Sequence, residues 1–104
     1  MPGHPVLVAR VADADPLGRA LQCAALLEAA REAGATPGGR DAPIMEQAEG
    51  QWRASLQADS AVDAEKTDEQ VTAVAKASST LPVAQRDAAA AWCVENAPEV
   101  DPEG

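Results

Sequence analysis

The sequence predicts an all-α protein, a small antiparallel bundle of about four helices with a possible extended arm at its N-terminus. Alanine, the strongest helix former, accounts for 25 of the 104 residues. Glycine and proline gather between segments whose apolar residues recur at helical spacing, and the connections are short. Only 17 residues are Leu, Val, Ile or Phe. We therefore expect a single domain over residues 1–104 with one thin, close-packed core.

The N-terminal segment, residues 1–14, is the hardest to assign. Its valines and leucine favour a short strand, yet no second strand pattern is present for it to pair with. An extended arm and the first turns of a helix both remain open. The apolar residues concerned are Val6, Leu7, Val8 and Val11.

The clearest helix is predicted over residues 16–33. Asp15 is a good N-cap, Pro16 suits the first helical position, and Gly34 follows as a C-terminal cap. Apolar residues then recur along one face, at Leu17, Leu21, Ala24 and Leu27.

Three further helices are expected. The second covers residues 43–59 and carries one narrow apolar stripe of Met45, Ala48, Trp52 and Leu56. The third follows a capping box at residues 67–70 and presents Val71, Val74, Ala75 and Ser78. The fourth runs from Pro82 to about Asn96, because Leu81-Pro82 ends the preceding helix. Residues 99–104 are predicted to form a flexible acidic tail.

Charge and hydropathy exclude several classes of partner. The net charge is −9, so phosphate backbones would repel the surface and a nucleic-acid partner is not expected. No apolar run is long enough to span a membrane, and the first residues do not have the pattern of a signal peptide. We expect a cytoplasmic protein with a protein partner, possibly basic, or one that associates with itself.

No catalytic or metal-binding motif is present. The single histidine, His4, stands in the proline-rich start, and paired metal-ligand spacings and phosphate-binding glycine loops are absent. We therefore expect no cofactor, no metal and no enzymatic activity.

The two cysteines allow more than one interpretation. Each of Cys23 and Cys93 lies among alanines, so we expect two separate buried thiols in a reducing compartment. A Cys23–Cys93 disulfide is the alternative, and it would join the first and last predicted helices. A redox or metal role for the thiols is the third.

The two tryptophans are expected to differ in role. Trp52 shares the apolar stripe of its helix and should lie in the core. On a helical wheel Val83, Ala90 and Val94 share one face of the last helix. Ala84, Ala88 and Trp92 lie on the opposite face, which we predict to be an interface with a second protein surface.

We therefore predict a small acidic, non-enzymatic protein–protein interaction module, acting as an adaptor, regulator or inhibitor. The alternative is a helical ligand-binding or thiol-redox protein that uses Cys23, Cys93 and a tryptophan-lined pocket.

Overall fold

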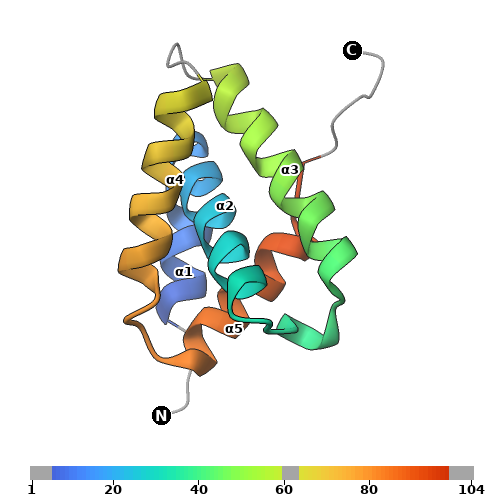
Figure 1. Cartoon of the computed structure of the whole chain (residues 1–104). Coiled ribbons are helices and arrows are strands. Elements are labelled where there is room, and N and C mark those ends of the chain that lie inside the picture. The colour runs from blue at the N-terminus through green and yellow to red at the C-terminus, as the bar shows by residue number, and fades with distance from the viewer. Residues whose placement is uncertain (1–5, 60–63, 99–104) are drawn as a thin grey trace.

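The computed structural model describes residues 6–59 and 64–98, whose regular elements are all helices with no strand among them. The elements are α1 (Val6–Asp13), α2 (Pro16–Glu32), the short 3-10 helix η1 (Pro37–Gly39), α3 (Ala42–Asp59), α4 (Ala64–Ser78) and α5 (Val83–Glu95). Helices α1 to α4 run alternately up and down in Figure 1, and α5 lies across their lower ends. The all-helical prediction is confirmed for these residues, which contain five α-helices where about four were expected. His4 and the predicted tail at 99–104 lie outside the described residues.

The N-terminal segment contains a helix, so of the alternatives that the sequence left open the helix is correct over α1, and the strand and the extended arm are not. Leu7 and Val11 stand one helical turn apart, and both are buried in the core, where tertiary packing outweighs the strand propensity of valine. The guanidinium of Arg19 donates to the carbonyl oxygens of Ala12 and Ala14, at 2.9 and 3.1 Å. These bonds occupy carbonyl groups that the end of a helix leaves unpaired.

Helix α2 is the centre of the fold, because α1, α3, α4 and α5 all pack on it. The backbone N–H of Gly18 donates to Asp15 Oδ1 at 2.8 Å, which confirms Asp15 as the N-cap. Gly34 follows the helix with a φ of 69°, the left-handed conformation that glycine adopts without strain. The buried residues of α2 have small or medium-sized side chains: Ala20, Cys23, Ala24, Ala25, Leu26 and Leu27.

Helix α3 matches its prediction closely. The stripe expected to be apolar is buried throughout, at Met45, Ala48, Trp52 and Leu56. The loop that leads into α3 packs on α5 through η1. At Gly38 a Cβ would stand 3.2 Å from the Cβ of Ala91, so glycine lets this loop approach α5 closely.

Helix α4 begins three residues before the predicted capping box. Thr67 is therefore inside the helix and almost fully buried, and the prediction that it caps the N-terminus is wrong. Val71 and Ala75 continue the buried face below it. Burial of this helix face outweighs the preference of threonine for a capping position.

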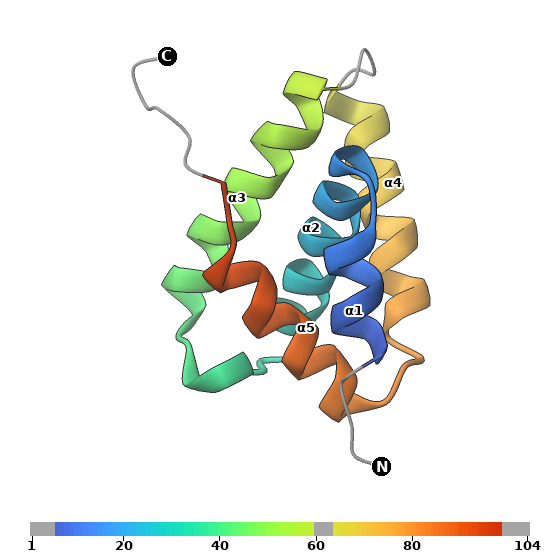
Figure 2. The ribbon, with the colours of Figure 1, turned by 180° about the vertical axis from the view of Figure 1, so that it is seen from behind.

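Helix α5 crosses the bundle instead of running along it, as the view from behind shows (Figure 2). It packs on α1, α2 and α3 and on η1. Its second half carries its buried residues, Ala89, Ala90 and Cys93. Among the described residues, none of the helices combines the length and apolar character needed to cross a membrane.

Candidate functional site

Cys23 of α2 and Cys93 of α5 form a disulfide, with their Cα atoms 5.4 Å apart. Both residues have no exposed surface. The expectation of two separate buried thiols is therefore wrong as to bonding and right as to burial. The alanines beside both cysteines make this bond possible. Their small side chains let the two crossing helices approach closely enough for a disulfide to form.

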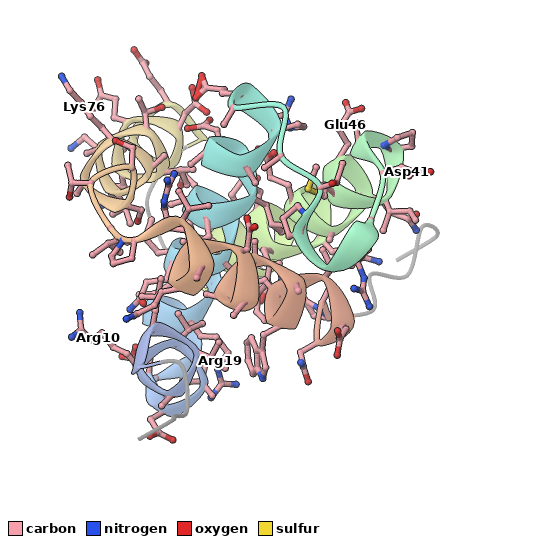
Figure 3. All side chains as sticks on the ribbon, turned by 90° about the horizontal axis from the view of Figure 1, so that it is seen from below. Arg10, Arg19, Asp41, Glu46 and Lys76 are labelled. Carbon is pink, nitrogen blue, oxygen red and sulfur yellow. A yellow bond between two sulfur atoms is a disulfide. The ribbon has the colours of Figure 1, made fainter. Side chains whose placement is uncertain are left out.

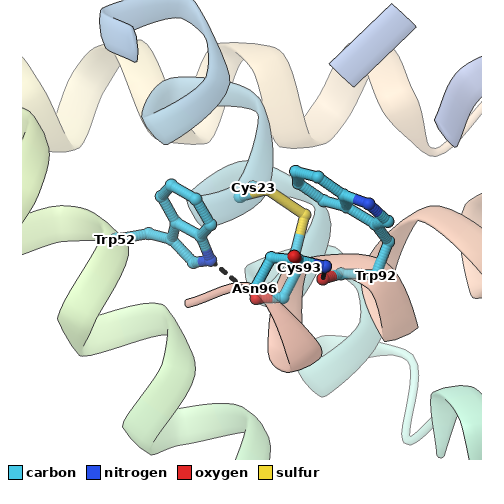
Figure 4. The surroundings of a disulfide bond; sticks show 5 residues. All are labelled: Cys23, Trp52, Trp92, Cys93 and Asn96. Carbon is cyan, nitrogen blue, oxygen red and sulfur yellow. Dashed lines mark hydrogen bonds between the residues drawn. A yellow bond between two sulfur atoms is a disulfide. The ribbon is translucent and has the colours of Figure 1, made fainter. Parts of the chain in front are cut away.

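Trp52 connects α3 to α5 next to the disulfide. Its indole Nε1–H donates to the carbonyl oxygen of Cys93 at 2.8 Å, and its ring is 5% exposed. That carbonyl lies in the last turn of α5, where no N–H of the helix is positioned to pair with it. The two indoles lie on opposite sides of the disulfide (Figure 4).

Trp92 is half-buried against the monomer's own core. Its two partners in the predicted interface differ: Ala84 is exposed and Ala88 is half-buried. Val83, expected on the buried face, is 60% exposed, because α5 crosses α2 and its first turn extends beyond the core. A helical wheel shows which residues share a face of one helix, but it does not show where that helix crosses its neighbours. The interface through Trp92, Ala88 and Ala84 stays a prediction.

An ionic network joins α2, α3 and α4 on another side of the molecule. The guanidinium of Arg53 reaches Glu28 at 2.9 Å, Glu49 at 2.8 Å and Asp68 at 2.7 Å. Arg31 also pairs with Glu49, at 2.7 Å. Glu49 is only 5% exposed, and its two arginine partners provide the compensation that a buried carboxylate needs.

Two groups of this network, Glu28 and Arg53, have pKa values shifted from their usual ones. The loss of hydration raises the pKa of Glu28 above its usual value, although the positive charge of Arg53 works in the opposite direction. For Arg53, burial lowers the pKa, but the hydrogen bonds that Arg53 donates to Asp68 and Glu49, together with the negative charges of these carboxylates, outweigh burial and the pKa rises overall. The ion pairs themselves place Arg53 of α3 between a carboxylate of α2 and one of α4, and so link the three helices. Within the described residues, no group of three or more His, Cys, Asp or Glu side chains is arranged to hold a metal ion.

A groove of about 560 Å³ lies between α1, α2 and α4. Helices α1 and α4 each pack on α2 and barely touch each other. Helix α2 therefore forms the floor of the groove, and α1 and α4 form its two walls. The lining is mainly apolar: Leu7, Leu21, Leu26, Val74, Ala77 and Leu81. Leu17, 40% exposed, stands one helical turn before Leu21 and extends this apolar surface.

Sequence reasoning did not find this groove. The spacing of Leu17 and Leu21 was visible as part of an apolar stripe, but that stripe was expected to be buried by neighbouring helices. The polar residues at the groove, Arg10, Gln22 and Ser78, do not belong to a sequence motif that indicates a binding site.

No protein-family model, curated protein or solved structure matches the chain. The function is therefore inferred from the geometry of this chain alone.

We predict that Trp52→Phe lowers the free energy of unfolding by about 1–3 kcal/mol, because it leaves the buried carbonyl of Cys93 without a donor. The matched control is Trp92→Phe, since the Trp92 side chain donates no hydrogen bond within the described part of the chain. Urea unfolding followed by far-UV circular dichroism measures both. Equal losses in the two variants would contradict the role assigned to the Trp52 hydrogen bond.

The raised pKa of Glu28 predicts a pH dependence of defined sign. The folded state takes up a proton at Glu28 before the unfolded state does, so acidification from neutral pH toward the usual glutamate range increases the free energy of unfolding. This gain should shrink in Glu28→Gln. Glu46→Gln, which removes an exposed carboxylate on α3 that does not contribute to the Glu28 shift, controls for the loss of one negative charge. A Glu28→Gln protein whose stability follows the wild-type pH profile would exclude this assignment.

Proposed function

We propose that the protein is a non-enzymatic interaction module, an adaptor, regulator or inhibitor, that binds an amphipathic helix of a partner protein in the groove between α1, α2 and α4. The observation that supports this most strongly is the groove itself: a floor and two walls made of helices, with a mainly apolar lining. Laying the apolar face of a helix into such a groove is a common mode of protein recognition.

The geometry favours a helix as the occupant. A partner helix laid along the groove would contact α2 below it and α1 and α4 beside it, as helices do inside a bundle. It would also cover Leu17 and Leu21, which are otherwise in contact with water. Exposed apolar surface of this kind is typical of interaction sites.

The ligand-binding and thiol-redox alternative has less support. A thiolate must reach a sulfur atom to exchange with a disulfide, and both cysteines are fully buried. Neither Trp52 nor Trp92 lines the groove. The acidic side chains of the Arg53 network are held by arginines, and we propose no catalytic role for them.

The disulfide also bears on where the chain acts. Disulfides of this structural kind persist in oxidising compartments and are rare in the cytosol. We therefore propose an oxidising compartment in place of the cytoplasmic location expected from the sequence. A protein partner also suits the net charge of −9 better than a nucleic acid does.

A synthetic peptide tests the groove. The probe is an amphipathic helix of about 15 residues with leucines at i, i+3, i+4 and i+7 and glutamines elsewhere. In an NMR titration we expect chemical-shift changes at the groove residues. Ala77→Lys should weaken binding about tenfold or more, because it places a charged side chain in the groove that the peptide must displace or desolvate.

Ala58→Lys is the matched control. Ala58 and Ala77 are both exposed alanines at the second-last position of a helix, α3 and α4 respectively, and Ala58 is not a groove residue. Its variant should bind as the wild type does. Shift changes spread over α3 or α5, or an Ala77→Lys protein with unchanged affinity, would contradict the proposed site.

A further inference from the structure

We infer that the partner helix carries a carboxylate beside its apolar face, and that this carboxylate pairs with Arg10 at the wall of the groove. The inference rests on the proposed function and specifies the chemistry of the partner.

The groove differs in charge from the molecule that contains it. The chain as a whole has a net charge of −9, but Arg10 is the single charged residue among those that line the groove. Two smaller hollows of the same structure are lined by equal numbers of acidic and basic residues: Glu28 and Glu32 with Lys76 and Arg86 in one, and Asp87 with Arg86 in the other. The overall charge suggested a basic partner, whereas the charge at the groove favours an acidic one.

Arg10 is available for a partner. It is exposed, and it makes no ion pair within residues 6–59 and 64–98, whereas Arg31, Arg40 and Arg53 each bind a carboxylate of the chain. Seen from below, Arg10 extends from α1 toward the side of the molecule on which α4 lies (Figure 3). Its guanidinium presents a planar fork of donors that fits a carboxylate.

The dimensions of the wall restrict where the carboxylate stands. Helix α1 has 8 residues and is therefore about 12 Å long. A partner helix can contact it over about two turns. Leu7, which contributes to the lining, and Arg10 are three residues apart on one face of α1. If a leucine of the partner helix packs beside Leu7, the partner's carboxylate must lie within about one turn of that leucine, on the side that faces Arg10.

Three versions of the probe peptide test this pairing. They have the same leucines and carry Glu, Gln or Lys at the flanking position. Affinities are measured by isothermal titration calorimetry at about 0.15 M salt, where the Debye length of about 8 Å screens the long-range repulsion from the acidic chain. For the wild type we expect the Glu peptide to bind about fivefold more tightly than the Gln peptide, and the Lys peptide to bind most weakly.

Two variants separate Arg10 from the general charge of the molecule. Arg10→Gln should abolish the preference for Glu over Gln. Lys76→Gln removes another cation, on α4, that is not a groove residue, and it should leave the preference unchanged. Far-UV circular dichroism confirms that both variants fold.

The outcomes are distinguishable. If all three peptides bind equally at the groove, the pairing with Arg10 is refuted and the proposed function stands. If the Lys peptide binds most tightly, or Arg10→Gln keeps the preference, the inference is likewise overturned. If no peptide binds, or if the NMR signals of the groove residues shift with protein concentration without peptide because a second copy of the chain covers the groove, the proposed function fails together with the inference.

Discussion

Where α5 crosses α2, Cys23 and Cys93 are bonded and the carbonyl oxygen of Cys93 accepts the indole N–H of Trp52. One buried point thus joins α2, α3 and α5. The chain has few large aliphatic side chains with which to hold these helices, and much of its buried surface is alanine. Small domains with a thin core commonly depend on a crosslink. A crosslink over a sequence separation of 70 residues constrains most of the unfolded chain.

This arrangement leaves one face of α2 open. Helix α5 covers one end of the bundle, the Arg53 network holds α3 and α4 against α2, and the short α1 packs on α2 and α5. Between α1 and α4 no element of the described chain fills the space over Leu21. The groove is therefore a result of the packing, and its apolar lining continues the face of α2 that a longer bundle would bury. The elements around it pack on α2, so the groove is present in the chain without a partner.

The parts of the fold that local sequence signals determine were predictable. Asp15, Pro16 and Gly34 mark the ends of α2, and the stripe through Trp52 identifies the buried face of α3. What depends on tertiary contacts was not predictable: the helical state of Leu7 and Val11 comes from packing on α2 and α5. The angle at which α5 crosses decides that Val83 is exposed.

The same limit applies to the site. Two cysteines 70 residues apart can be bonded or separate, and their spacing alone does not decide between these states. The charge of the whole chain is readable from its composition, but the charge at the groove depends on which side chains three helices bring together. Arg10 therefore had no distinguishing feature in the sequence, although it is the residue on which the chemistry of the partner rests.

The most direct measurement is urea unfolding of the wild type with and without a reductant, followed by far-UV circular dichroism. Reduction should lower the free energy of unfolding by about 4 kcal/mol, a large part of the roughly 5–15 kcal/mol typical of native proteins. The Cys23→Ala/Cys93→Ala double variant should unfold identically in both conditions, which excludes an effect of the reductant itself. An unfolding midpoint of the wild type that does not change on reduction would contradict the central role of the disulfide and remove the basis for an oxidising compartment.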